Sequence, residues 1–188
     1  MAIQLAGVKA TTHELIGASE IEADLDSIAE STMPGEFLYS LIASGQLAEG
    51  VRFLSCAMTP AQAIAWAYKC VRSLVREGAT EPQKKALAAV EGWLSSPDDG
   101  KRRAAKGLAD EAPLASPEGC IAMAVFFAEG SISPEPNPAV PPPPHVCQRI
   151  AAGAIVYAVV SDKPEKSAER FREAVNMGIA LLGGKVSV

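Results

Sequence analysis

The chain has 188 residues, of which 48% are apolar and 21% charged, with a formal net charge of −5. This is the balance of one globular domain, or of two very small ones, and it excludes a disordered or collagen-like chain. The acidic charge argues against a nucleic-acid role, since affinity for phosphate backbones rests on Lys and Arg. Aromatic residues make up only 5%, so small side chains at close approach must build the core. That favours helices, and we expect an all-α protein.

The first 58 residues are the least regular part of the chain. Residues 20–28 alternate acidic and apolar side chains, yet their apolar positions also fit a helix, so helix and strand both stay open. A helix is expected from Met33 to Ser44, and a second short one over residues 47–54. We divide the chain into an N-terminal region, 1–58, helical or partly irregular, and an α-helical domain, 59–184.

Helix starts recur through residues 59–184. At each, a Ser, Thr or Asp that can cap the helix is followed within two residues by proline, which suits the first turn. The expected capping residues are Thr59, Thr80, Ser96, Ser116 and Asp162. Because the connections are short, successive helices should pack as antiparallel neighbours. We expect a bundle or a solenoid-like array of about seven to nine helices.

The segment from His145 to Val160 is apolar nearly all round. If it is helical, it should be the central and most buried helix, although its β-branched residues keep a strand as the alternative. A last helix is expected from about Lys163 to Leu182, ending at the glycines 183 and 184.

The most specific feature is a proline-rich segment, residues 133–145. Seven of the eleven residues from Pro134 to Pro144 are proline, which predicts a stiff polyproline II rod that crosses the bundle. The rod either docks in an aromatic-lined groove of a protein partner or braces this protein's own surface. The candidate partner-binding residues are Ile132, Pro134, Val140, Pro141, Pro142, Pro143, Pro144 and His145.

Three aromatic residues, Trp66, Tyr68 and Trp93, fall on two consecutive expected helices. They could line a ligand pocket. We interpret them as core anchors instead, because alanine-rich antiparallel helices need a few large side chains to fill the gap between them.

The cysteines and histidines give no pattern typical of a metal or catalytic site. The four cysteines lie far apart without a C-x-x-C pair, and only two histidines are present. We expect buried, reduced thiols, no cofactor and no bound metal. His145 is expected to help satisfy a helix terminus, and Cys147 to pack as a small hydrophobe.

One basic run, Lys101 to Arg103 with Lys106, stands among acidic residues. We interpret it as the solvated face of a helix. The longest apolar stretch, Ile150 to Val160, is too short to span a bilayer, and residues 1–10 lack the pattern of a leader, so a cytoplasmic location is expected.

Three stretches and the proline-histidine run resemble an uncharacterised bacterial family, classed only as a domain of unknown function. They are residues 63–72, 103–105 and 122–132, followed by Pro141–His145 and shorter matches at 152–154 and 168–171. The resemblance covers roughly Pro60 to Gly184 and leaves residues before about Ala57 outside. It implies a bacterial helical protein and carries over no catalytic residue. Two of the helices also resemble, more loosely, those of helical immunity proteins.

These observations favour a non-enzymatic interaction module, such as an adaptor, accessory or scaffold component, with a bacterial secretion or toxin system as one setting. The alternative is a helical immunity protein that neutralises a cognate toxin. Both hypotheses require a protein partner, and an acidic, alanine-rich bundle is compatible with a monomer or a homodimer.

Overall fold

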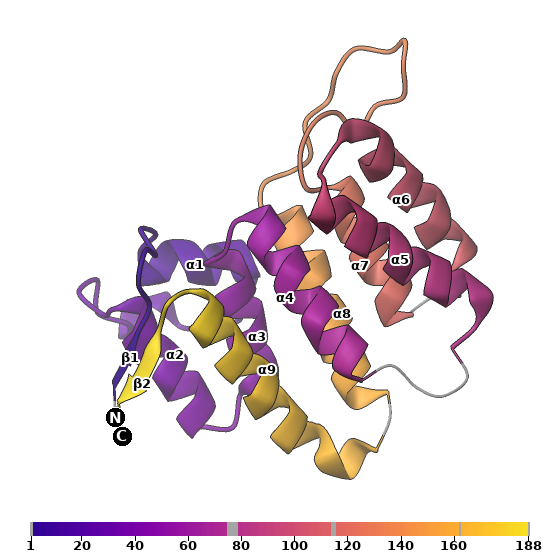
Figure 1. The fold of residues 1–188 in the computed structure, drawn as a ribbon. Helices are drawn as coiled ribbons and strands as arrows, with labels where there is room; N and C mark the ends of the chain where they lie inside the picture. Colours follow the sequence, from indigo (N-terminus) through magenta and orange to yellow (C-terminus); the bar gives the residue numbers. More distant parts are fainter. Residues whose placement is uncertain (1, 75–78, 114–115, 162, 188) are drawn as a thin grey trace.

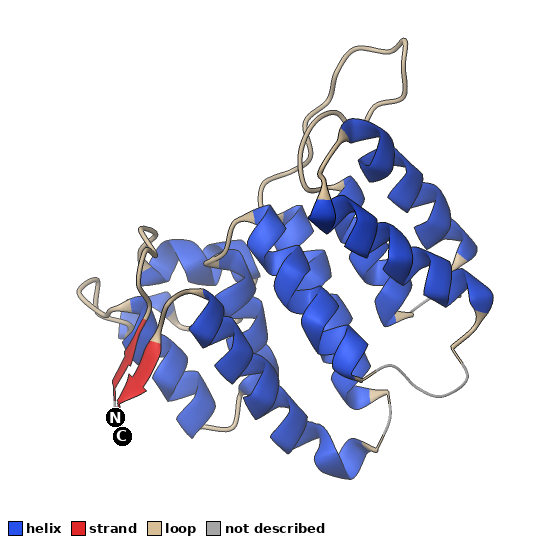
Figure 2. Cartoon of the chain, viewed as in Figure 1, coloured by secondary structure: helices blue, strands red, loops and turns tan. Residues whose placement is uncertain are grey.

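The fold of the computed structural model is a bundle of α-helices with one small sheet (Figures 1 and 2). The structure describes residues 2–74, 79–113, 116–161 and 163–187. Over these residues the elements are β1 (Ala2–Gln4), α1 (Thr12–Ser19), α2 (Pro34–Ala43), α3 (Leu47–Cys56), α4 (Pro60–Ser73), α5 (Glu81–Ser95), α6 (Asp99–Glu111), α7 (Pro117–Phe126), α8 (Val146–Val160), α9 (Ser167–Leu181) and β2 (Lys185–Ser187). Short 3-10 turns lie at Leu25–Ser27 and Pro164–Lys166. The all-α prediction is confirmed.

Helix α8 is the centre of the bundle. It packs against α3, α4, α7 and α9, as the expected central helix should. In Figure 1, α4 and α8 lie between a group formed by α5, α6 and α7 and a second group that holds α1, α2, α3, α9 and the sheet. Since α8 contacts helices far from it in sequence, the fold is a bundle and not a solenoid-like array, in which each unit contacts only its neighbours.

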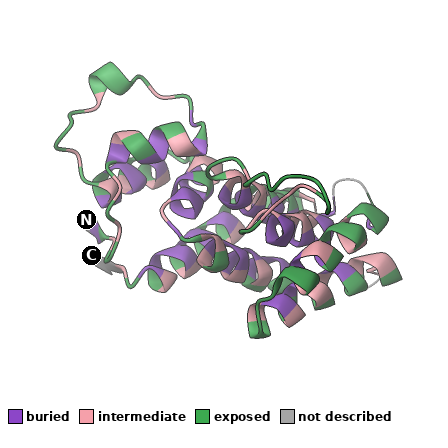
Figure 3. Cartoon of the chain, turned by 90° about the horizontal axis from the view of Figure 1, so that it is seen from above, coloured by how far each residue is buried: buried purple, intermediate pink, exposed green. Residues whose placement is uncertain are grey.

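Although α8 is apolar nearly all round, it is not buried on every face. Ala151, Ala154 and Ile155 are buried, whereas Tyr157 and Val160 are 38% and 44% exposed. Figure 3 shows the same pattern over the whole molecule, with buried residues where helices face one another and exposed residues on the outer faces and loops.

A single hydrophobic core joins the N-terminal region to the rest of the chain. It includes Ile3, Leu38 and Phe53 from residues 1–58, together with Ile64 and Ile155 from residues 59–184.

Residues 20–28, for which helix and strand were both left open, form neither a strand nor an α-helix. The regular structure in this stretch is the 3-10 turn Leu25–Ser27. The N-terminal region also contributes two elements that were not expected, α1 and β1.

Most of the expected helix caps are present. Thr59 and Gln62 form a reciprocal capping box, and Ser116 accepts a hydrogen bond from the Gly119 N–H. The prediction of Ser96 as the cap of α6 is wrong: Asp98 caps that helix by accepting from the Lys101 N–H at 2.8 Å, while Ser96 closes the end of α5. Asp162 lies outside the described residues.

Strands β1 and β2 pair antiparallel, with Ile3 opposite Val186. Strand β1 packs so tightly on the start of α2 that a Cβ on Gly35 would overlap the carbonyl oxygen of Ile3. Only glycine allows this approach.

We expect Gly35→Ala to lower the free energy of unfolding by about 1–3 kcal/mol, because the added methyl group displaces β1. Urea denaturation followed by circular dichroism measures it. The matched control is Gly17→Ala at an exposed position of α1, where a Cβ meets nothing and alanine should stabilise the helix by about 0.5–1 kcal/mol. Equal stability of the two variants would contradict the prediction.

Candidate interaction site

The proline-rich segment lies between α7 and α8 and projects from one end of the bundle (Figure 1). We call residues 131–145 the proline loop. Its two limbs are joined near the base, where the Ile132 N–H donates to the Val140 carbonyl at 2.8 Å. The hydroxyl of Ser131 accepts from the N–H groups of Val140 and Ser133 at 3.0 and 3.1 Å. The loop therefore has a closed, hydrogen-bonded base.

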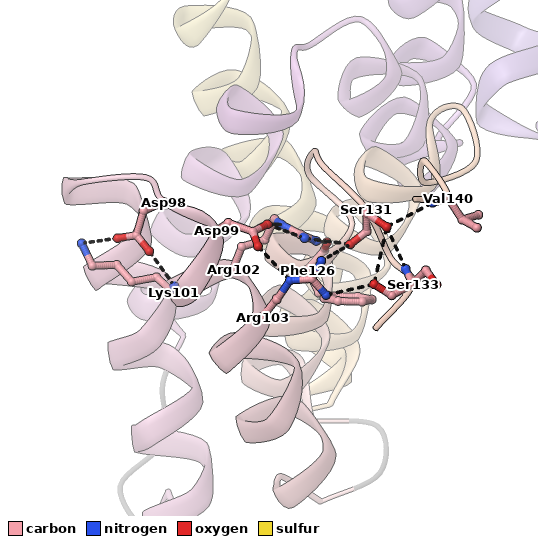
Figure 4. A network of polar contacts seen from close by, with 9 residues as sticks. All are labelled: Asp98, Asp99, Lys101, Arg102, Arg103, Phe126, Ser131, Ser133 and Val140. Atoms are coloured by element: carbon pink, nitrogen blue, oxygen red, sulfur yellow. Dashed lines mark hydrogen bonds and ion pairs between the residues drawn. The ribbon is translucent and has the colours of Figure 1, made fainter. Parts of the chain in front are cut away.

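The base of the loop is held by Arg102 of α6, whose side chain is fully buried. Its guanidinium donates to the carbonyl of Phe126, the last residue of α7, at 2.6 Å and to the carbonyl of Ser131 at 2.8 Å. It also donates to Asp99 from Nε and Nη2, at 2.9 and 2.6 Å, and lies over the Phe126 ring at 5.3 Å. Four hydrogen bonds in the plane of one guanidinium fix the position where the loop leaves α7 (Figure 4).

A second arginine extends this contact along the loop. Arg103 donates to the other carboxylate oxygen of Asp99 at 2.7 Å and to the carbonyls of Ser131 and Ser133, each at 3.2 Å. Asp99 thus bridges two arginines that both bind the loop backbone. We call Asp99, Arg102 and Arg103 the arginine anchor (Figure 4).

The chain turn that leads into the loop requires a glycine. Gly130 has a φ of +69°, and a Cβ there would lie 3.2 Å from Nη2 of Arg102. A side chain at this position would be strained and would push against the arginine anchor.

The interpretation of the basic run as a solvated helix face is wrong at Arg102. Lys101 and Lys106 do reach solvent and pair with Asp98 and Asp110, but Arg102 points inward with Ala105, three residues further along α6. The pattern that could have revealed this is the row of alanines at 105 and 109 on the face of α6 that carries Arg102.

Hydrogen bonds from Arg103 and Arg102 hold the pKa of Asp99 below its ordinary value. A lowered pKa stabilises the folded state when the carboxylate is ionised, and this contribution is lost as the pH falls through the folded-state pKa. We therefore expect Asp99→Asn to be less stable than the wild type near pH 7, and the gap to close as the pH drops below 3.8, the ordinary value. Urea midpoints measured from pH 7 to pH 2.5 test this, and a gap that does not narrow at all below pH 3.8 would contradict it.

The predicted polyproline II rod is interrupted by a turn. The Asn137 N–H donates to the Pro134 carbonyl at 3.0 Å, which folds the segment back on itself so that it does not cross the bundle as a rod. Residues 134–141 are all exposed, Val140 at 47%. Within the predicted run Pro141–Pro144, three prolines are exposed and Pro142 is half-buried, as is Ile132. The candidate partner-binding residues thus gather on one projecting loop.

His145 ends the proline loop at the start of α8. It has a φ of +57°, its side chain is exposed, and it makes no side-chain hydrogen bond to the helix end. The expectation that its side chain satisfies the helix terminus is therefore wrong. Its contribution is the backbone carbonyl, which accepts from the Arg149 N–H at 3.0 Å.

Comparison with known proteins shows which family the chain belongs to. The model of a family of unknown function (DUF6931) matches residues 37–182, which is most of the chain. The chain belongs to this family. No curated protein and no solved structure gives a significant match. The DUF6931 match contains the proline loop and the arginine anchor, and it begins in α2, so the expectation that the family pattern leaves out everything before Ala57 is wrong for residues 37–56.

The two tryptophans of the DUF6931 region are core residues, as interpreted from the sequence. Trp66 is 1% exposed and Trp93 is 2% exposed. Trp66 donates from Nε1 to the carbonyl of Ala174 in α9 at 2.9 Å, whereas Nε1 of Trp93 is buried and has no hydrogen-bond partner within the described part of the chain.

Tyr68 does line a groove, of about 540 Å³, between α4 and α5. Its hydroxyl accepts from Arg72 at 2.9 Å, and Arg72 lies 3.6 Å from Glu91. Tyr68, Arg72 and Glu91 therefore already have polar partners among themselves.

The four thiols of the DUF6931 region are free, and all but Cys120 are buried. Burial raises the pKa of Cys56 to about 11 and those of Cys70 and Cys147 to about 12. Thiolate, the reactive form, is scarce at such values. In the part of the chain that the structure describes, no three His, Cys, Asp or Glu residues group as metal ligands. In the same residues no helix is long and apolar enough to cross a membrane.

Proposed function

We propose that this protein is a bacterial, cytoplasmic interaction module without enzymatic activity, which uses the proline loop to dock on a protein partner. The observation that carries the proposal is the contrast within the loop: residues 134–141 are exposed, while the base is fixed by a fully buried arginine. A loop that served only to connect α7 and α8 would not need two arginines that donate to the backbone carbonyls of Phe126, Ser131 and Ser133.

The composition of the exposed part indicates the kind of partner. Proline-rich segments bind grooves lined by aromatic side chains, because their backbone is already extended and their N–H groups are few. Fixing the base lowers the conformational entropy that binding would otherwise cost. The buried thiols with raised pKa values support the non-enzymatic part of the proposal, because they make poor nucleophiles.

The test is affinity capture from the native cytoplasm with the wild type and a variant in which Pro141, Pro142, Pro143 and Pro144 are replaced by alanine. The proposal requires that the wild type capture one partner in stoichiometric amount. The Kd of the complex between that partner and each form of the protein is then measured with purified proteins. We expect the variant to weaken binding at least tenfold while its urea midpoint stays close to that of the wild type.

The matched control is Pro97→Ala, an exposed proline on the connection between α5 and α6, which should leave the Kd unchanged. Wild-type protein that captures no stoichiometric partner, or a partner that binds the variant equally well, would overturn the proposal. A variant that loses cooperative unfolding would instead show that the prolines brace the bundle.

A further inference from the structure

A second groove, of about 490 Å³, lies between α2 and α9 and is also lined by Ile3 of β1 and by Gly184. We call it the α2–α9 groove; Figure 1 shows the two helices beside the sheet. Its volume is that of a site for a small organic ligand. Its apolar walls are Ile3, Ile42, Leu47, Val175, Ile179 and Ala180.

Three polar side chains also line the groove: Tyr39, Arg172 and Asn176. Among the described residues none of the three has a hydrogen-bond or ion-pair partner. This contrasts with the groove beside Tyr68, where the tyrosine, arginine and glutamate bind one another. Among the residues that the structure describes, no acidic side chain lines the α2–α9 groove, although the chain as a whole carries a net charge of −5.

Helix α9 orders these groups along the groove. Arg172 and Asn176 are four residues apart and share a face with Val175 and Ile179. Arg172 comes first along α9, Val175 and Asn176 follow, and Ile179 and Ala180 lie nearest to Gly184. The backbone of Ile179 lies about 10 Å further along the helix axis than that of Arg172. The α9 wall is thus charged at its Arg172 end and apolar toward Gly184.

We propose that the α2–α9 groove binds an aliphatic monocarboxylate of medium chain length. The carboxylate accepts from Arg172, with Asn176 and Tyr39 as further donors, and the hydrocarbon chain lies along Val175, Ile179 and Ile3. A guanidinium and an amide both donate, so the headgroup must accept hydrogen bonds, and the positive charge selects an anion. This inference does not depend on the proposed role of the proline loop, which lies on other elements.

The test is isothermal titration calorimetry of the full chain with octanoate, octan-1-ol and octylamine. We expect octanoate to bind at least about fivefold more tightly than the alcohol, and octylamine to bind most weakly. In the series hexanoate, octanoate, decanoate, each added methylene group should raise the affinity by up to about fourfold, until the chain fills the groove.

Two variants assign the binding to this groove. Arg172→Gln should lower the affinity for octanoate about fivefold and leave that for octan-1-ol unchanged, because it removes the charge and keeps the apolar walls. Ala180→Phe, at an exposed position on the groove wall, should block both ligands without loss of helicity. The matched control is Arg52→Gln, an exposed arginine on α3 that does not line this groove.

Absence of heat from octanoate at millimolar concentration, or equal binding of octanoate and octylamine, would overturn the proposal. Unchanged octanoate binding by Arg172→Gln would overturn it too, because the site would then lie elsewhere.

Discussion

Replacing Arg102 with methionine is expected to lower the free energy of unfolding by about 3 kcal/mol. The substitution removes donors from two backbone carbonyls, those of Phe126 and Ser131, at a fully buried position. Methionine fills much of the space but donates nothing, so the Phe126 carbonyl loses its side-chain donor and the Ser131 carbonyl keeps only the 3.2 Å bond from Arg103. Asp99 is left without this partner, but its side chain is 59% exposed, so water solvates its charge and adds little to the loss.

Arg103→Met is the matched control for this effect. Arg103 contacts the same aspartate and the same loop, but its side chain is 32% exposed, and water can replace its donors. We expect a loss below about 1 kcal/mol. Urea denaturation gives both values, and equal losses for the two variants would show that burial of Arg102 is not what matters.

Arg102→Met should also loosen the proline loop before the bundle unfolds. The Ile132 and Val140 N–H groups are hydrogen-bonded at the base of the loop, so their amide hydrogen exchange reports on its closure. We expect exchange at these two amides to speed up by a larger factor than exchange in α8, whose amides follow only the fall in the overall free energy of unfolding. An equal acceleration throughout the chain would mean that Arg102 stabilises the fold without any special effect on the loop.

The helices of this protein could largely be predicted from local patterns. Capping residues such as Thr59 and Ser116 act through hydrogen bonds within one turn, so their effect is visible in the sequence. The β1–β2 pair could not be predicted, since its strands are three residues each and join the two ends of the described chain. Short strands depend on what they pack against, and Gly35 is the contact that allows it.

The candidate site was predictable in composition but not in shape. Seven prolines in eleven residues identified the loop, yet the turn at Pro134–Asn137 and the closure between Ile132 and Val140 bring together residues whose pairing no local pattern indicates. Arg102 was wrongly predicted to be solvated, because charged residues are rarely fully buried. Its burial is favourable because it binds backbone partners far along the chain. Those partners lie 24 and 29 residues away.

Trp66→Ala is expected to have the largest effect on stability of any single substitution considered, about 3–5 kcal/mol. The indole packs so closely on α9 that a Cβ on Gly178 would lie 2.9 Å from Cζ2 of the ring. Truncation therefore opens a cavity between α4 and α9 and removes the hydrogen bond to Ala174. Trp93→Ala should also cost several kcal/mol, because that side chain is equally buried.

The phenylalanine variants separate ring packing from hydrogen bonding in these two residues. Trp66→Phe and Trp93→Phe each replace the indole with the smaller phenyl ring. Only Trp66→Phe also loses a hydrogen bond, which should lower its free energy of unfolding by about a further 1 kcal/mol. Trp93→Phe removes a buried N–H that has no partner among the described residues, and so relieves a desolvation cost. We therefore expect Trp93→Phe to be more stable than Trp66→Phe by about 1–2 kcal/mol, measured by urea denaturation and far-ultraviolet circular dichroism. The reverse order would show that the Trp66 contact with Ala174 contributes nothing, and that packing alone decides how each tryptophan stabilises the bundle.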